Sequence, residues 1–258
     1  MNCGLERNGE RGFCGGERGG IKITQKISQE GGEDETAIMI PSEYKSIYPE
    51  LIFNQNKSDL CVPCSISLIR HIQIFNRYGI NVIPDPIFIY CKRNNDMHQG
   101  NGMIVSEALS IVKQYGIPEI TDNPIKYLNT YSEYEYLQLK DLYTNKSEIL
   151  DRDKIKDYCL LCTYNDIKEA IMKYCAVTIT VKKHTAIYHP DVNTNEAFIN
   201  YYKYENYPTE NHHQLTIIGW KNDNWIIQNS FGKNYGKNGI AYMPMDVPII
   251  DPWCIIDE

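Results

Sequence analysis

The stretches NHHQLTIIGW at 211–220 and NSFGKNYGKNGIAYM at 229–243 lie close together in the chain, and each begins with polar residues. The apolar residues of the two stretches are typical of adjacent β-strands. A strand needs neither a histidine just before its apolar run, where His213 stands, nor an asparagine just after its neighbour, where Asn229 stands. We therefore interpret His213 and Asn229 as candidate site residues and look upstream for a nucleophile.

The composition excludes several classes of function. The chain has 258 residues and 42% apolar residues, as in ordinary globular proteins. The net charge is −7 and no Lys/Arg run stands out, so we expect no nucleic-acid partner. No apolar stretch approaches the roughly 18 residues of a membrane span, and we expect no membrane association. The polar start, MNCGLERNGERGFCGG, lacks the apolar region of a secretory signal, which predicts a cytoplasmic or a virion- or host-associated protein.

The chain contains nine cysteines, an odd number, so at least one thiol is free or paired with another chain. Most of them stand among apolar residues and are expected to be small buried hydrophobes. Two C-x-x-C pairs, Cys61/Cys64 and Cys159/Cys162, have a spacing that zinc sites use. Their apolar surroundings argue against zinc, and we predict neither a metal nor a cofactor.

Composition divides the chain into three parts. Residues 1–40 are polar and Gly-rich, apart from IKITQKIS at 21–28, which alternates like a strand. We interpret 1–40 as an N-terminal extension and a candidate short prosegment. Helical patterns dominate 41–165, the predicted left lobe, and strand patterns dominate 166–258, the predicted right lobe. Helices first and strands later predict an α+β fold in two lobes.

The segment DLCVPCSISLIRHIQIFNRYG at 59–79 has the clearest helical pattern. We expect Asp59 to cap this helix, Pro63 to lie in its first turn and Gly79 to end it. Apolar residues occupy nearly every side of this helix, which predicts that it is central and buried. The other expected elements are helices at 103–116, 127–146 and 164–174, the last capped by Asn165 or Asp166, and strands at 176–183, 214–220, 225–230 and 239–243.

Cys61 stands where the helix at 59–79 begins. A helix N-terminus lowers the pKa of a thiol, because the dipole and the free N–H groups favour the anion. Gln55 lies six residues before Cys61 in a polar turn, and His213 and Asn229 follow far downstream. These companions favour Cys61 as a nucleophile over a buried structural cysteine.

Together these four residues resemble the papain family of cysteine peptidases. In that family the cysteine begins a long central helix and the histidine follows about 130–150 residues later. Here the interval from Cys61 to His213 is 152 residues. The family's asparagine opens a run like NSWGxxWGxxGY, and this chain has NSFGKNYGKNGIAY, with Phe231 and Tyr235 at the two aromatic positions.

The resemblance covers about residues 41–246. GNGMIVSEALSIVKQYGI looks like the family's Gly-rich wall of the substrate cleft followed by a helix. This implies that Gly102 and Met103 contact the substrate, together with Phe231. IKEAIMKYCAVTITV looks like the family's passage into the β-rich lobe. The resemblance thus implies a papain-like fold, with a helical left lobe, a β-barrel right lobe and the cleft between them.

The chain departs from the family around the nucleophile, because CGSCW is absent and SDLCVPCSI stands in its place. If Cys64 were the nucleophile, Ser58 would occupy the glutamine position and an oxyanion donor would be lost. With Cys61 as the nucleophile, Gln55 has the family's spacing, and CVPCS resembles the CVAxA type of bacterial and viral relatives. We favour Cys61. Phe231 replaces the tryptophan that covers the family's His–Asn hydrogen bond.

The resemblance implies the chemistry of a thiol protease. His213 would accept the thiol proton of Cys61, and Asn229 would orient the imidazole through its side-chain oxygen. The thiolate would attack a peptide carbonyl and form a thioester, while Gln55 and the Cys61 N–H hold the oxyanion. It also implies a protein or peptide substrate, no cofactor, and a cathepsin-like zymogen in which the N-terminal segment inhibits the enzyme.

Several alternatives stay open. An acyltransferase or transpeptidase could use the same residues, and a catalytically weak relative could only bind peptides. Bacteriocin-processing peptidases share the spacing of Gln55 and Cys61, but they use aspartate where this chain has Asn229. His212 is less favoured than His213 as the functional histidine, because strand neighbours point to opposite faces.

Overall fold

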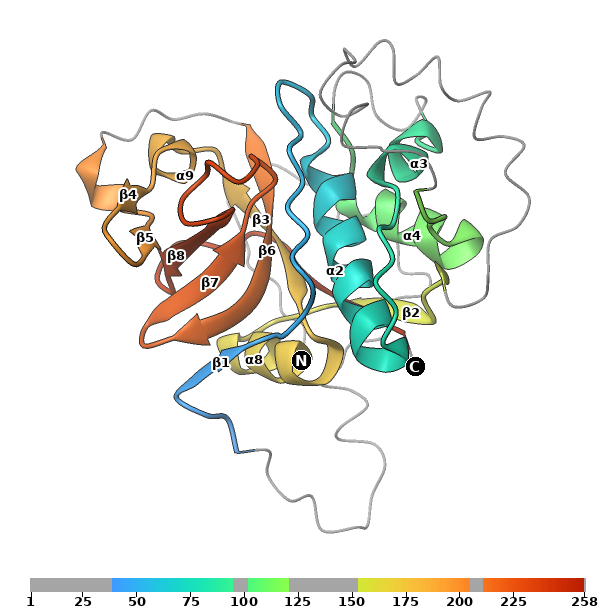
Figure 1. Cartoon of the computed structure of the whole chain (residues 1–258), viewed down its shortest axis with the longest axis horizontal. Coiled ribbons are helices and arrows are strands. Elements are labelled where there is room, and N and C mark those ends of the chain that lie inside the picture. The colour runs from blue at the N-terminus through green and yellow to red at the C-terminus, as the bar shows by residue number, and fades with distance from the viewer. Residues whose placement is uncertain (1–38, 95–101, 121–152, 205–210, 258) are drawn as a thin grey trace, which may run out of the picture.

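The computed structural model describes residues 39–94, 102–120, 153–204 and 211–257. In Figure 1 the helices α2, α3 and α4 gather on one side of the molecule and most strands on the other. The predicted α+β fold with a helical and a β-rich lobe is confirmed. The expected strand at 21–28 and the expected helix at 127–146 lie outside the described residues. None of the helices in the described ranges is both long enough and apolar enough to span a membrane.

Helix α2 (Cys61–Tyr78) is the central element of the helical lobe. Gly79 ends it as predicted, in the left-handed conformation with φ 68°, and its N–H donates to the Phe75 carbonyl at 2.8 Å. The prediction of Asp59 as the cap was wrong: Leu60 holds the N-cap position, and no side chain caps the helix. The first-turn N–H groups of α2, which include that of Cys61, therefore lack a capping side chain.

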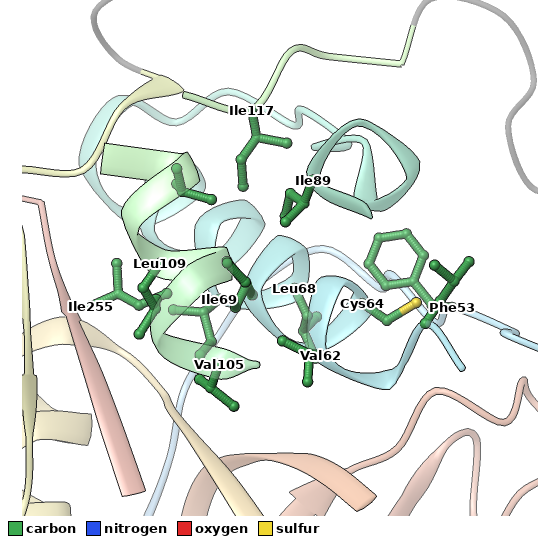
Figure 2. Packing of buried hydrophobic residues seen from close by; sticks show 14 of the residues in the cluster. Phe53, Val62, Cys64, Leu68, Ile69, Ile89, Val105, Leu109, Ile117 and Ile255 are labelled. Atoms are coloured by element: carbon green, nitrogen blue, oxygen red, sulfur yellow. The ribbon is translucent and has the colours of Figure 1, made fainter. Parts of the chain in front are cut away.

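The core of the helical lobe lies around α2. Figure 2 shows Ile69 of α2 close to Val105 and Leu109 of α4. Helix α4 (Val105–Tyr115) confirms the helix expected at 103–116, and the short helix α3 (Pro86–Cys91) was not expected. This packing buries almost every position of the first four turns of α2, and so it fixes the helix whose first residue is Cys61.

The strands of the described ranges form one nine-stranded sheet with the order β2-β9-β3-β6-β7-β8-β5-β4, and β1 pairs with β6. All pairs are antiparallel except β5 with β8. The expected strands are β3 (Val177–Lys182), β6 (His212–Lys221), β7 (Asn224–Gln228) and β8 (Ile240–Pro244). The unexpected ones are β1 (Glu43–Lys45), β2 (Asp157–Leu160), β4 (Asp191–Val192), β5 (Ala197–Phe198) and β9 (Pro252–Ile256).

Two sequence predictions about element ends need correction. His213 lies inside β6 rather than before it, because its backbone continues the ladder opposite Val181 of β3. Helix α8 (Tyr164–Tyr174) is capped by Thr163, not by Asn165 or Asp166. Asp166 instead completes a capping box by accepting from the Thr163 N–H at 2.8 Å. The remaining short helices among the described residues are α9 (Thr185–Tyr188) and η2 (Tyr201–Lys203).

Buried hydroxyl groups join the two lobes next to the site. Ser65 of α2 lies 2.7 Å from the hydroxyl of Thr178 on β3 and 2.7 Å from that of Thr216 on β6. Hydrogen bonds in such a buried setting are strong and directional. They set the position of the first turns of α2 against β6, which carries His213. The sheet takes strands from both predicted lobes, and the lobe boundary at 165 stays a prediction.

Candidate active site

The two cysteines of CVPC have different surroundings. Cys64 is only 1% exposed, and Figure 2 shows it beside Phe53 in the core of the helical lobe. Cys61 is partly exposed at the start of α2. The backbone N–H of Gln214, on β6, interacts with the Cys61 sulfur and favours its thiolate. Cys61 is thus the thiol that lies next to the strand of His213.

His213 and Asn229 are hydrogen-bonded, with 2.9 Å between Nε2 and Oδ1. The Ser230 N–H donates to the same Oδ1 at 2.8 Å, which identifies that amide atom as the oxygen. Because Oδ1 can only accept, Nε2 of His213 carries the proton in this bond. Nδ1 is then the basic nitrogen of the neutral imidazole.

An aromatic stack covers this pair. The Phe231 ring lies on the His213 imidazole, with centroids 4.9 Å apart and planes at 15°. Tyr188 of α9 stacks in turn on Phe231 at 5.2 Å, and the Tyr235 ring meets the edge of Phe231 at 5.7 Å. His213 and Asn229 are each 3% exposed. Phe231 therefore covers one face of the imidazole in this buried pair.

Gln55 is tied to the residue that follows Asn229. Its N–H donates to the Ser230 carbonyl at 2.8 Å, and its Oε1 accepts from the Ser230 hydroxyl. Its Nε2 donates to the Ser58 carbonyl at 2.6 Å. One hydrogen of this amide is thus engaged and the other stays available for a further acceptor.

Burial controls the ionisation of the thiol and the imidazole. Burial raises the pKa of the Cys61 thiol, and this effect exceeds the opposing contribution of the Gln214 N–H. Burial also lowers the pKa of His213 to about 4, although the hydrogen bond to Asn229 opposes the shift. Asp59 raises both pKa values and Lys183 lowers both. Each charge alone is disfavoured, whereas transfer of the thiol proton to the imidazole creates opposite charges that attract each other.

The remaining predicted site residues lie on the helical lobe. Gly102, with φ 91°, offers its carbonyl to the Arg93 guanidinium. The Met103 side chain is 8% exposed and belongs to the core cluster around α2. Their contact with substrate stays a prediction. Within the described ranges, no three His, Cys, Asp or Glu side chains are grouped so that they could hold a metal ion.

Sequence patterns missed several residues of this site. Tyr188 stands in a short helix whose residues show no motif. Gln214 takes part through its backbone N–H, which no side-chain pattern can signal. Ser230 could have been found, because it follows Asn229 directly within NSFG.

Comparisons with solved structures support the fold. Xylellain, a cysteine protease from Xylella fastidiosa, superposes with a TM-score of 0.59 at 15% identity, over 85% of this chain and 87% of its own. Digestive procathepsin L 3 of the Tenebrio molitor larval midgut gives a TM-score of 0.61 at 13% identity, over 86% and 71% of the two chains.

Sequence comparisons identify the family. Peptidase 1 of Dermatophagoides pteronyssinus is 30% identical over 105 residues, which are 37% of this chain and 31% of that protein. This chain thus matches about a third of the length of that relative. The model of the papain family cysteine proteases matches residues 85–256, a range that includes His213 and Asn229 and starts after Gln55 and Cys61. The chain belongs to the papain family of cysteine proteases.

Proposed function

We propose that this peptidase hydrolyses peptide bonds with Cys61 as nucleophile, His213 as base and acid, Asn229 as the orienting residue and Gln55 as an oxyanion donor. Membership of the papain family supports the peptidase activity. The observation that carries the residue assignment is the 2.9 Å bond between His213 Nε2 and Asn229 Oδ1, on a strand whose next residue, Gln214, interacts with the Cys61 sulfur.

The first half of the reaction forms a thioester. His213 Nδ1 takes the thiol proton as the sulfur of Cys61 attacks the carbonyl carbon of the peptide. The negative charge on the carbonyl oxygen is held by the Cys61 N–H, which has no capping side chain as a competitor, and by the second Nε2 hydrogen of Gln55. The carbon–nitrogen bond then breaks, His213 gives its proton to the leaving amine, and the acyl group stays on the sulfur.

The second half restores the enzyme. A water molecule attacks the thioester while His213 accepts one of its protons, and the carbon–sulfur bond breaks to release the acid. Asn229 keeps the imidazole in one orientation through both halves, since its Oδ1 accepts from Nε2–H throughout. Phe231 and Tyr188 keep water away from this hydrogen bond.

The reaction class is tested by the products. Purified protein is incubated with a peptide library, with and without an added primary amine, and the products are identified by mass spectrometry. The proposal expects free carboxyl ends at the cleavage sites, and hydrolysis products that stay dominant when the amine is present. Dominant transfer to the amine would replace hydrolysis by the acyltransferase function. If the peptides bind to the protein but stay intact, the protein is a peptide-binding relative without peptidase activity.

We propose in addition that residues 1–40 restrain the enzyme as a short prosegment. The support is the position of this extension ahead of the first described strand, together with a zymogen, a procathepsin, among the similar structures. A chain that starts at Met39 keeps the bond from the Trp220 indole to the Pro41 carbonyl, at 3.0 Å. This truncated chain should cleave a small peptide faster than the full chain. Equal rates would reduce the extension to a tail without a restraining role.

A further inference from the structure

The amide of Asn229 uses only one of its two ends in the contacts described above. Its Oδ1 accepts from His213 and from the Ser230 N–H. Its Nδ2 is buried and has no complete hydrogen bond within the described part of the chain. A buried amide nitrogen without a partner is costly and leaves the rotation of the amide less well determined.

Tyr235 offers the matching group. Its hydroxyl is buried and likewise has no complete hydrogen bond to any described residue, and the side chain as a whole is 5% exposed. Burial raises the pKa of Tyr235, and the interaction with the Asn229 side chain is the contribution that opposes this rise. The nitrogen can only donate and the hydroxyl can accept, so the two unsatisfied groups are complementary.

The backbone holds these two residues next to each other. The Asn229 N–H donates to the Gly239 carbonyl at 3.0 Å, and the Gly239 N–H donates to the Tyr235 carbonyl at 2.8 Å. Gly239 has a φ of 78°, and a Cβ there would lie 2.7 Å from the Ile52 side chain. The backbone N–H and C=O of a single residue, at a position that requires glycine, therefore link Asn229 to Tyr235.

We propose that Tyr235 is a positioning residue of this site, whose hydroxyl accepts a hydrogen bond from Asn229 Nδ2 and so holds Oδ1 toward His213 Nε2. This inference rests on the proposed function. If the amide turned over, Nδ2 would face the Nε2–H of His213 and the Ser230 N–H, and three donors would meet without an acceptor. With the Tyr235 hydroxyl as acceptor for Nδ2, both the oxygen and the nitrogen of the Asn229 amide have hydrogen-bond partners in the observed orientation.

The test removes one oxygen atom. Tyr235→Phe keeps the ring that supports Phe231 but loses the hydroxyl. We expect kcat on a peptide substrate to fall about tenfold, with KM little changed, because only the orientation of the base is affected. The matched control is Tyr174→Phe on α8, another buried tyrosine of the β-rich lobe, which should keep the kcat of the wild-type protein.

A double-mutant cycle separates positioning from a general structural role. If Tyr235 acts through Asn229, Tyr235→Phe should cause no further loss in an Asn229→Ala background. An equal loss in both backgrounds would overturn the proposal, and so would a Tyr235→Phe kcat within twofold of wild type. If Tyr235→Phe does not fold, Asn229→Asp and Asn229→Ala are compared. The Tyr235 hydroxyl can donate to a carboxylate, so we expect the Asn229→Asp variant to retain activity and the Asn229→Ala variant to lose it. If both variants are equally inactive, the proposal is overturned.

The same cycle is also read by the rate at which a vinyl-sulfone peptide labels the thiol. Labelling needs the Cys61–His213 pair but no turnover. If the thiol is labelled but no peptide is hydrolysed, the proposed function is wrong. The labelling rates of the single and double variants would then still decide the role of Tyr235. If hydrolysis is normal and the losses caused by Tyr235→Phe and Asn229→Ala simply add in the double variant, the proposed function holds and the role of Tyr235 is rejected.

Discussion

Asn229 Oδ1 lies 2.9 Å from His213 Nε2, both side chains are buried, and the ring of Phe231 stacks on the imidazole. The two residues come from the sequence neighbourhoods of adjacent antiparallel strands, β6 and β7, whose pairing brings position 213 close to position 229. Oδ1 also accepts from the Ser230 N–H, which identifies it as the oxygen of the amide. The His213 nitrogen that faces it, Nε2, is therefore the protonated one.

Replacing Asn229 by alanine should slow turnover by about 100-fold or more, since a free imidazole samples unproductive orientations and tautomers. KM for a peptide substrate should change little. The check is steady-state kinetics together with a thermal melt that shows a folded protein. Activity within a few-fold of the wild type would mean that another group orients His213.

Replacing Gln55 by alanine should lower kcat about 100- to 1,000-fold, as expected for the loss of one oxyanion donor. The Gln55 amide is held by Ser58 and Ser230, so Ser230→Ala should give a smaller loss in the same direction. An increase in KM with unchanged kcat would instead make Gln55 a contact for the substrate in its ground state.

The stability of the fold should fall as the pH drops from 6.5 toward 4. His213 has its pKa lowered from 6.5 to about 4 by burial, so the unfolded chain binds this proton and the folded chain does not in that window. Stability then rises with pH there, by at most about 1.4 kcal/mol per unit and roughly 3 kcal/mol in all. Urea unfolding at several pH values should show that His213→Gln removes this part of the slope. An unchanged slope in the variant would contradict the assignment.

Removing the ring of Tyr188 should expose the thiol. Tyr188 stacks on Phe231 and interacts electrostatically with Cys61. Tyr188→Ala should therefore increase the rate of alkylation by iodoacetamide several-fold. Tyr202→Ala, at an 86% exposed position of the same lobe, is the matched control and should leave the rate unchanged. A Tyr188 variant that reacts no faster than this control would show that the ring does not restrict access.

Local patterns predicted the long elements of the fold. The apolar periodicity and the terminal glycines of α2 and α4 depend only on neighbouring residues, and so does the alternation in β3, β6, β7 and β8. The N-terminal caps of α2 and α8 were missed because the N-cap position is known only once the first helical residue is known. Leu60 rather than Asp59 precedes Cys61, and Thr163 rather than Asn165 precedes α8.

The elements that were not predicted depend on distant partners. β1 has three residues and exists because it pairs with β6, and β2 is held by β9 nearly a hundred residues later. The same reason applies to the site. The spacing of Gln55 and Cys61 and the run that follows Asn229 are visible in the sequence, whereas the ring of Tyr188 reaches the site only through the folded chain.

Locating the covalent adduct of a vinyl-sulfone peptide decides whether Cys61 is the nucleophile. The wild-type protein and the variants Cys61→Ala and Cys64→Ala are treated in parallel and digested, and the modified cysteine is identified by mass spectrometry. We predict an adduct on Cys61 in the wild-type protein and in Cys64→Ala, and no adduct on Cys64 in Cys61→Ala. An adduct on Cys64, lost in Cys64→Ala and kept in Cys61→Ala, would show instead that Cys64 is the nucleophile.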